Sequence, residues 1–221
     1  MVGLLVAQLV GAIGAIAVLA AAGYTGEDAF DTAPLAVLFL AQSALWAGYL
    51  GWTWFTSRSK GSGLVADFGL RWSPKDAAYG LLIGICTQLV LVRLLYIPIL
   101  LVWDDQDVSQ VAQDLVDRAS SPWDAIVLVV LVGVGAPIVE ELFYRGLLLR
   151  SLDNRFGSTW ALVISSVLFG AIHLQLLQFP ALTLFGAIAA WLTLRSRRLG
   201  PAIWTHVGFN LTTVVALLIS S

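Results

Sequence analysis

The sequence predicts an all-α polytopic transmembrane helical bundle of about seven to eight helices, on three observations. Apolar residues make up 59% of the 221 residues and charged residues only 12%, whereas soluble domains have about 25% charged residues. The mean hydropathy is +0.87. The charges are clustered, which leaves apolar runs near the ~20 residues that a bilayer-spanning helix requires. Such a chain has too little polar surface to form a soluble globule.

Seven apolar runs are expected to span the membrane, and together they form one integral membrane domain over residues 1–221. The runs are 2–23, 34–56, 77–103, 123–149, 158–177, 181–194 and 201–219. The sixth run is short and follows Pro180 directly. The first run ends in three alanines that resemble a signal-peptide cleavage site, but no positive charge precedes it and its apolar stretch exceeds the usual ~7–15 residues. We therefore expect the first run to be a span.

The segments that connect these runs alternate in the sign of their charge. The acidic connections are 24–33 and 104–122, and the basic ones are 57–75, the pair Arg150 and Arg155, and the group Arg195, Arg197 and Arg198. Basic connections of multi-pass proteins in the cell membrane face the cytoplasm, so we expect a cytoplasmic N-terminus and a C-terminus outside. The net charge of −2 and the absence of a long basic tract argue against nucleic-acid binding.

Several polar side chains fall inside the apolar runs of the C-terminal half. They are Glu140, Glu141 and Arg145 in the fourth run, His173 in the fifth, and His206 and Asn210 in the seventh. The chain has two histidines in total, and both belong to this set. Ionisable residues inside spans are rare and face the bundle interior at functional sites. We therefore expect these side chains to meet in a polar site inside the bundle.

The spacing in the fourth run separates the roles of the two glutamates. Glu141 precedes Arg145 by four residues, which is the favourable order for an ion pair on one helix face. Glu140 points about 100° away around the helix and has no cation of its own, which suits a general base. Pro137 is expected to kink the helix and to free backbone groups. A structural Glu141–Arg145 clamp is the alternative, but it leaves Glu140 unexplained.

The two histidines allow a structural and a functional interpretation. A single intramembrane histidine is often a hydrogen-bonding partner between helices. Phe169 precedes His173 by four residues, and His206 precedes Asn210 by four, so each pair shares a helix face. The two histidines, the asparagine and the glutamates together favour function. Residue counting places His206 shallower than His173 by more than about 10 Å, which requires a protruding or strongly tilted helix.

Arg93 is the corresponding charge in the N-terminal half, past the middle of the third run. We expect it to extend toward Trp103 and Asp104 at the membrane surface or to pair internally. The other intramembrane polar residues are concentrated in the C-terminal half. This asymmetry argues against a proton-coupled transporter, in which both halves would contribute broken helices.

The polar set suits hydrolysis of an amide bond by activated water. Glu140 would activate the water, and His173 would orient it or carry its proton. His206 and Asn210 would donate hydrogen bonds to the developing oxyanion. A zinc ion on Glu140, His173 and His206 is the alternative, because catalytic zinc takes three protein ligands and keeps an open position. The chain lacks the His-Glu-x-x-His helix of many zinc peptidases, so we favour no required cofactor over a single zinc ion.

Three ordered motifs resemble those of the CAAX prenyl protease and bacteriocin-processing (CPBP, Abi) family. The family pattern is Glu-Glu-x-x-x-Arg, then Phe-x-x-x-His, then His-x-x-x-Asn or Asp. The matching segments here are Glu140-Glu141-Leu142-Phe143-Tyr144-Arg145, Phe169-Gly170-Ala171-Ile172-His173 and His206-Val207-Gly208-Phe209-Asn210. The resemblance covers roughly residues 123–219, which would form the catalytic core. Only general membrane character matches in the N-terminal half.

The resemblance implies an intramembrane endopeptidase of about eight helices that acts on a membrane-associated protein or peptide. Glu140 would be the base with His173 as its partner, His206 and Asn210 would lie at the oxyanion, and Glu141 with Arg145 would support them. Phe169 would contact the substrate. Family members have been described both as metalloproteases and as metal-independent glutamate proteases. The prenylated substrate of the eukaryotic members is not carried over to this chain.

Two further expectations concern access and activity. The active-site cavity is expected to open toward the cytoplasmic side, with membrane lipid and the substrate as its partners. The alternative to an enzyme is a non-catalytic membrane scaffold or bacteriocin-immunity protein that retains the protease fold. In that case replacement of Glu140 would leave the biological effect unchanged.

Overall fold

The computed structural model describes residues 2–101 and 110–220, and within these ranges every regular element is a helix. Six helical segments are long and apolar enough to cross a membrane by length and composition. They are Gly3–Ala21, Leu35–Ser59, Pro74–Leu100, Pro122–Phe156, Phe179–Ser196 and Gly200–Ser220. The predicted all-α polytopic bundle is therefore confirmed.

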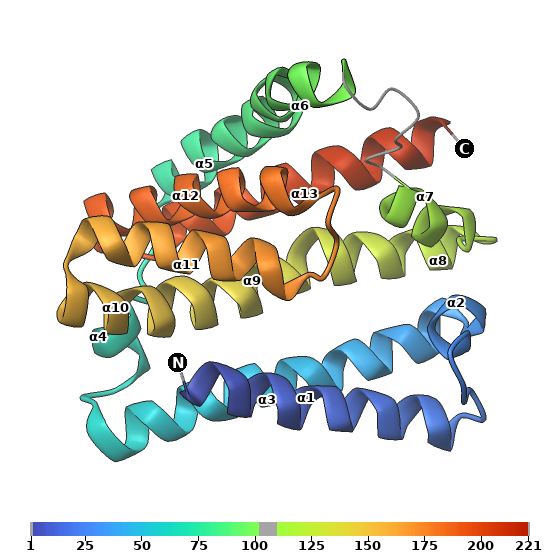
Figure 1. Cartoon of the computed structure of the whole chain (residues 1–221), viewed down its shortest axis with the longest axis horizontal. Coiled ribbons are helices and arrows are strands. Elements are labelled where there is room, and N and C mark those ends of the chain that lie inside the picture. The colour runs from blue at the N-terminus through green and yellow to red at the C-terminus, as the bar shows by residue number, and fades with distance from the viewer. Residues whose placement is uncertain (1, 102–109, 221) are drawn as a thin grey trace.

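The first two spans are single helices, α1 (Val2–Ala21) and α3 (Leu35–Lys60), which pack against each other as a hairpin (Figure 1). Short helices occupy the connections: α2 (Ala29–Thr32) between α1 and α3, α4 (Leu64–Phe68) after α3, and α7 (Gln110–Asp117) before the fourth span.

Two long helical rods contain π-helical segments. The third span consists of α5 (Pro74–Cys86), η1 (Thr87–Leu91) and α6 (Val92–Leu100). The fourth consists of α8 (Pro122–Leu128), η2 (Val129–Gly135), α9 (Ala136–Glu141), η3 (Leu142–Leu148) and α10 (Leu149–Phe156). Segments of η2 and η3 therefore flank the helical turn that carries both glutamates. Single π turns are rare and frequently mark functional sites.

The fifth predicted span is too short to cross a bilayer. It forms α11 (Ser158–Ile172), a 15-residue helix of about 22 Å, whereas the hydrocarbon core is about 30 Å thick. The chain turns after His173, where Leu174 adopts a left-handed φ of 55°, and continues into α12 (Phe179–Ser196). The prediction of a span over 158–177 is thus wrong, because this apolar run includes the turn.

The two ends of the bundle, which Figure 1 shows on the left and on the right, differ in the charge of their residues. The basic end carries α4, α10 and the turn between α12 and α13 (Gly200–Ser220), and it includes the arginines of the predicted cytoplasmic connections. The acidic end carries α2, α7 and the C-terminal end of α13. These two names are used below for the two ends.

Helix α13 packs closely on α5 because both helices carry glycines at their contact. A Cβ atom on Gly84 would lie 2.1 Å from the carbonyl oxygen of Thr205, and one on Gly208 would lie 2.7 Å from that of Leu81. Small residues let helix backbones approach in this way in membrane proteins. The contact fixes the helix that presents His206 and Asn210 to the rest of the bundle.

Candidate active site

The core of the site is a buried ion pair within the fourth span. Arg145 Nη1 donates to Glu141 Oε1 over 2.9 Å, and the two side chains are 1% and 0% exposed. The guanidinium also donates to the carbonyl oxygen of Gly186 over 3.3 Å and lies 4.3 Å from the ring centroid of Phe169. The predicted pairing of these residues is confirmed. Glu141 is therefore held by a cation that is itself fixed by α11 and α12.

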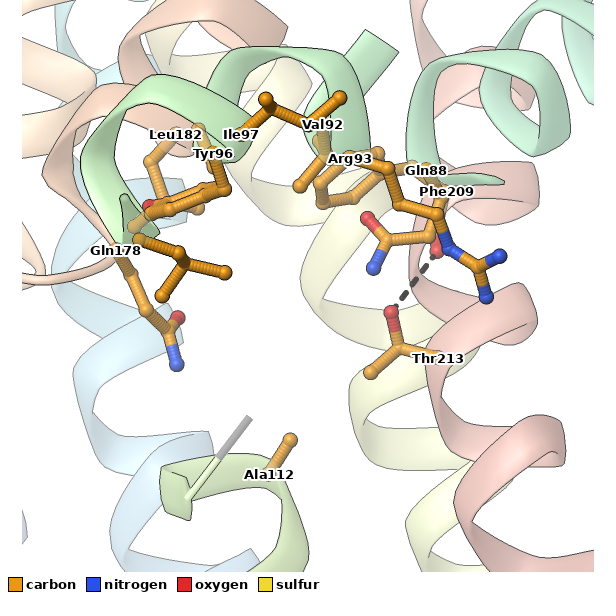
Figure 2. Close-up of a pocket in the computed structure, with 12 residues that line it drawn as sticks. Gln88, Val92, Arg93, Tyr96, Ile97, Ala112, Gln178, Leu182, Phe209 and Thr213 are labelled. Atoms are coloured by element: carbon orange, nitrogen blue, oxygen red, sulfur yellow. Dashed lines mark hydrogen bonds between the residues drawn. The ribbon is translucent and has the colours of Figure 1, made fainter. Parts of the chain in front are cut away.

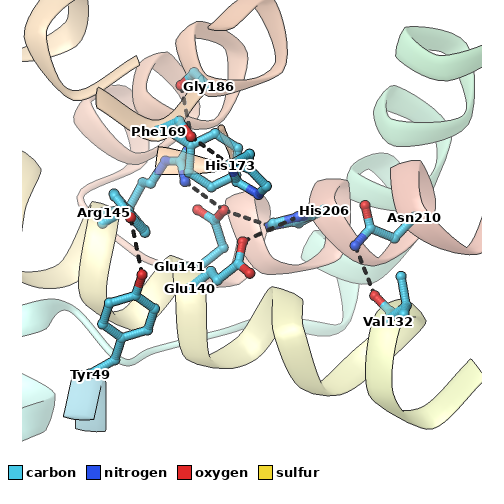
Figure 3. Close-up of polar contacts among 11 residues, drawn as sticks. Tyr49, Val132, Glu140, Glu141, Arg145, Phe169, His173, Gly186, His206 and Asn210 are labelled. Atoms are coloured by element: carbon cyan, nitrogen blue, oxygen red, sulfur yellow. Dashed lines mark hydrogen bonds and ion pairs between the residues drawn. The ribbon is translucent and has the colours of Figure 1, made fainter. Parts of the chain in front are cut away.

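His206 joins this pair from α13 (Figure 3). Its Nδ1 contacts Glu141 Oε1 at 2.8 Å, and its Nε2 lies 4.0 Å from Glu140 Oε2. A carboxylate bound to Nδ1 makes this nitrogen the donor and fixes the orientation of the ring. Glu141 thus holds His206 so that Nε2 faces Glu140. Sequence analysis did not predict this contact. His206 and Glu141 are 65 residues apart and lie on different helices, so their spacing in the sequence does not indicate that they meet.

Glu140 differs from its neighbour in exposure. Its side chain is 15% exposed, whereas that of Glu141 is fully buried. Glu140, His173, His206 and Asn210 all line one cavity of about 300 Å³. The predicted polar residues therefore converge on a common space, with Glu140 as the carboxylate that a bound molecule could reach.

His173 enters the cavity from the end of α11. Its Nδ1 lies 2.7 Å from the carbonyl oxygen of Phe169, which makes Nδ1 the donor and leaves Nε2 for the cavity. The Phe169 ring lies 4.9 Å from the His173 ring and 5.8 Å from the His206 ring, measured between centroids. The two histidines therefore reach the same level of the bundle, although residue counting placed them at different depths.

Phe169 does not have the predicted substrate contact. Its side chain is fully buried, and it is not part of the cavity wall. It packs between both histidines and the Arg145 guanidinium. An aromatic face so enclosed by its neighbours has no surface left for a substrate, so Phe169 fixes the positions of the groups around it.

Asn210 and Pro137 are linked through the backbone of η2. Asn210 Nδ2 donates to the carbonyl oxygen of Val132 over 2.8 Å. In the π-helical register, this carbonyl would accept from residue 137, and proline has no N–H to donate. Pro137 thus leaves the Val132 carbonyl oxygen free, as predicted for backbone groups near this proline. The hydrogen bond from Asn210 to this oxygen joins α13 to the fourth span. One N–H of the Asn210 amide is used in this contact and the second is left for the cavity.

The alternative zinc set does not form a three-ligand centre. Among the residues that the structure describes, no group of three or more His, Cys, Asp or Glu side chains is placed to hold a metal ion. The contacts of His206 Nδ1 with Glu141 and of His173 Nδ1 with the Phe169 carbonyl leave both Nε2 atoms available, so these contacts do not argue against a metal. Because Glu140, His173 and His206 are not gathered as one ligand group in the described residues, we derive no step through a metal.

Tyr49 is a further polar neighbour that sequence analysis missed. Its hydroxyl lies 3.4 Å from that of Tyr144 in the first motif and also donates to Gln8 Oε1 in α1. The signal was available, because Gln8 is a polar side chain in an otherwise apolar first run. This hydroxyl pair connects the N-terminal hairpin to the fourth span, which carries the glutamates.

The cavity lies toward the acidic end of the bundle. Its wall includes Phe30 of α2, Ala112 and Leu115 of α7, and Gln175 in the turn after α11. Helix α11 ends at Ile172, before it reaches the acidic end of the bundle. The space beyond its end belongs to the cavity, and residues of α2 and α7 border it.

The basic end is closed below the glutamates. Phe68 of α4, Leu142 of η3 and Leu199 before α13 form a buried apolar cluster there. Asp67 holds α4 in place by accepting from the backbone N–H groups of Ser62 and Gly63. This packed cluster lies between the cavity and the basic connections, toward which the sequence analysis expected the cavity to open.

Comparison with known proteins supports the motif analysis. Residues 122–212 match the family model described as Type II CAAX prenyl endopeptidase Rce1-like. These residues are therefore similar to the CAAX prenyl protease and bacteriocin-processing family. Over 91 residues it is also 29% identical to a Bacillus subtilis (strain 168) protein named "Putative membrane peptidase YdiL".

Both family matches are confined to the part of the chain that holds the site. The alignment covers 41% of this chain and 37% of the Bacillus relative, so the chain matches little more than a third of that protein's length. All three family motifs lie inside the matched residues 122–212. A search of solved structures found no match.

Proposed function

We propose that the chain is an intramembrane endopeptidase that hydrolyses a peptide bond of a membrane-associated protein or peptide with water activated by Glu140. The observation that carries this proposal is the sequence of contacts from Arg145 through Glu141 and His206 to Glu140. It aims an imidazole at the one carboxylate of the pair that lines the cavity. A general base acts on a group within hydrogen-bond distance or through one water molecule. The cavity at Glu140 has room for a water molecule and a peptide bond.

The proposed reaction begins when Glu140 takes a proton from water and the hydroxide oxygen attacks the carbonyl carbon of the scissile bond. The oxyanion that forms accepts hydrogen bonds from the second N–H of Asn210 and from His173 or His206 when Nε2 is protonated. The carbon–nitrogen bond then breaks, and the proton on Glu140 passes to the leaving amine. The products are one carboxylic acid and one amine, between which a proton then passes to give carboxylate and ammonium, and Glu140 returns to its first state.

A purely structural role for the Glu141–Arg145 ion pair explains these contacts less well than a catalytic role does. Glu141 Oε2 and Arg145 Nε are buried and have no hydrogen-bond partner in the described chain. Each such group costs about 1–3 kcal/mol, so the pair is a poor means of stabilising a bundle. A clamp also requires neither the cavity nor an imidazole that faces a second carboxylate. These points favour a catalytic arrangement over the scaffold interpretation.

The proposal is tested with the purified protein in lipid and a library of quenched, membrane-tethered peptides. Wild type and Glu140→Ala are compared, each with and without a chelator. Glu27→Gln is the matched control, because it removes an exposed carboxylate that does not line the cavity. We expect cleavage by wild type and by the control, but not by Glu140→Ala. Equal cleavage by wild type and Glu140→Ala would favour the scaffold function, and loss on chelation would indicate a metal.

A further inference from the structure

A polar cavity of about 370 Å³ lies at the basic end of the bundle, between α3, α4 and α10. We call it the basic-end cavity. Two opposite charges, Arg150 and Asp67, belong to its wall. Its uncharged polar lining residues are Thr56, Ser57, Ser151 and Asn154. None of its lining residues also lines the cavity at Glu140, so the two cavities are separate sites.

Arg150 provides the positive charge, and no carboxylate contacts it. Its Nη2 donates to the carbonyl oxygen of Arg197 over 2.9 Å. It forms no ion pair with any side chain that the structure describes, and its Nε is buried without a hydrogen-bond partner in the described chain. A guanidinium stays charged, and its N–H donors match the oxygens of a phosphate group. The Arg150 side of the cavity therefore suits a phosphate.

Asp67 provides the negative charge on the same wall. Its carboxylate accepts hydrogen bonds from the backbone N–H of Ser62 over 2.8 Å, the Ser57 hydroxyl over 2.8 Å and the backbone N–H of Gly63 over 3.0 Å. These neutral donors, Ser62 first, lower the pKa of the Asp67 carboxyl, so it is ionised at neutral pH. No cation lies within 4.0 Å of it among the described side chains. The Asp67 side therefore suits a cation.

The hydroxyl groups of the wall specify which kind of cation fits. Each already donates its hydrogen within the protein. The bonds run from Thr56 to the carbonyl oxygen of Trp52 (2.9 Å), from Ser57 to Asp67 (2.8 Å) and from Ser151 to the carbonyl oxygen of Leu147 (2.7 Å). A hydroxyl has one hydrogen and two acceptor lone pairs, so these oxygens can only accept. They suit a primary ammonium, which has three N–H donors, and not a quaternary ammonium, which has none.

An apolar cavity of about 250 Å³ adjoins the basic-end cavity. Thr56, Leu147 and Ser151 line both, and the apolar one continues between α3 and the fourth span to Trp52 and Phe143. Phe143 precedes Ser151 by eight residues, or about 12 Å along a helix, on the side away from the basic end. Basic pockets between spans at the membrane surface bind lipid headgroups. A polar space at the end of the spans with an apolar space beneath it has the shape of a phospholipid.

A larger cavity, between the third span, α12 and α13, lacks this charge pattern (Figure 2). It has a volume of about 380 Å³ and also contains an arginine, Arg93, but no Asp or Glu is among its described lining residues. The contacts of Arg93 expected with Trp103 and Asp104 lie outside the described residues. Arg93 is thus an arginine on a cavity wall without an opposite charge, which makes it a matched control for Arg150.

We propose that the basic-end cavity binds the headgroup of phosphatidylethanolamine, with the phosphate at Arg150 and the primary ammonium at Asp67, and that the adjoining apolar cavity holds one acyl chain. The ligand would join α3 and α4 to the fourth span at the membrane surface. This lipid site goes beyond the proposed peptidase function and does not depend on it. The soluble ester O-phosphoethanolamine has the same two charges and is the other source of this chemistry.

The test measures quenching of tryptophan fluorescence by lipids with brominated acyl chains, because bromine quenches only on close approach and Trp52 lines the apolar cavity. The protein is placed in phosphatidylcholine vesicles that contain a minor fraction of brominated phosphatidylethanolamine, phosphatidylcholine or phosphatidylglycerol. We expect the ethanolamine lipid to bind about tenfold more tightly than the other two, as hydrogen bonds to charged groups imply. The chain has nine tryptophans, so Trp52→Phe is needed to show that the excess quenching arises at this site.

Two variants separate the two charges. Asp67→Asn should remove the preference for the ethanolamine lipid over phosphatidylglycerol, because the ammonium loses its anion. Arg150→Gln should weaken binding of the ethanolamine lipid, because the phosphate loses its cation. Arg93→Gln should leave the preference intact. The comparison of headgroups with wild type needs no variant, so it decides the matter even if Asp67→Asn loosens α4.

Several results would overturn the proposal. They are equal quenching by the ethanolamine and choline lipids, a preference for phosphatidylglycerol in wild type, excess quenching that persists in Trp52→Phe, and an ethanolamine preference that survives both Asp67→Asn and Arg150→Gln. Displacement of the lipid by O-phosphoethanolamine at equal concentration would show that the site takes the soluble ester instead. No peptide is cleaved in this measurement, so failure of the peptidase function would leave the result unaffected.

Discussion

At the scale of single residues, the site depends on one oxygen atom of Glu141. Arg145 Nη1 and His206 Nδ1 both contact Glu141 Oε1, at 2.9 and 2.8 Å. The contact with Arg145 compensates the negative charge of Glu141. The contact with His206 orients the imidazole so that its Nε2 faces Glu140. A change at Arg145 should therefore affect both the stability of the bundle and the direction of His206.

Arg145→Met is expected to lower the free energy of unfolding by about 3–5 kcal/mol, because it leaves a buried carboxylate without its cation. Thermal unfolding in a fixed lipid measures the change. The double variant Arg145→Met with Glu141→Gln should recover part of the loss, since the unpaired charge is removed. An equal loss in the single and double variants would show that packing of the guanidinium, and not the ion pair, is responsible.

Sequence alone could predict the contacts that lie within one helix. The pair Glu141 and Arg145 follows from their spacing of four residues, which places both on one face. The contacts of His206 with Glu141 and of Asn210 with Val132 join different helices, and their register is set by how α13 packs. Periodicity cannot provide this register, although the residue types indicated that such contacts form.

At the scale of helices, the position of α13 depends on glycines at its contact with α5. Gly84 allows the two backbones to approach so closely that a Cβ atom would overlap the Thr205 carbonyl oxygen at 2.1 Å. Since His206 follows Thr205 directly, the same contact sets the position of the imidazole. The short α11 has a comparable effect, because its early end creates the space for the cavity.

Gly84→Ala is expected to reduce stability by about 1–3 kcal/mol through overpacking and to lower the rate of peptide cleavage, because α13 must move. Gly51→Ala in α3 is the matched control, since a Cβ atom there would meet nothing within 4 Å. Melting temperature and cleavage rate are measured for both variants in the same lipid. A Gly84→Ala protein with the stability and rate of the control would contradict the assigned role of this contact.

The sequence predicted the existence of the helices better than their ends. The run 158–177 is apolar enough for a span, but its last residues form a turn after His173. Gln175 and Gln178 were the available signal, because two amides near the end of an apolar run suit a turn beside a polar cavity. The π-helical register of η2 and η3 leaves no such signal in residue types.

At the scale of the whole molecule, the cavity at Glu140 and the basic connections lie toward opposite ends of the bundle. Residues of α2 and α7 border the cavity, whereas Phe68, Leu142 and Leu199 close the basic end. If the basic end faces the cytoplasm, as the distribution of arginine and lysine favours, substrates reach Glu140 from outside. The access side could not be predicted from sequence, because it depends on which short helices border the space around the turn after α11.

Cysteine labelling in intact cells tests this orientation. Cys86, the one cysteine of the chain, is first replaced by serine. Gln175→Cys, in the cavity wall, is then expected to react with a membrane-impermeant maleimide from outside. Ser62→Cys, at the exposed basic end, should react only after permeabilisation. The reverse pattern would place the cavity on the cytoplasmic side.

The central claim is that Glu140 activates the water that cleaves the substrate. The most direct measurement is the single-turnover cleavage rate of one defined membrane-tethered peptide by wild type and by Glu140→Gln in the same lipid. The account predicts a loss of about 10²–10⁴-fold in the variant, the range for removal of a general base, with substrate binding retained. A Glu140→Gln rate within a few-fold of wild type would contradict the account.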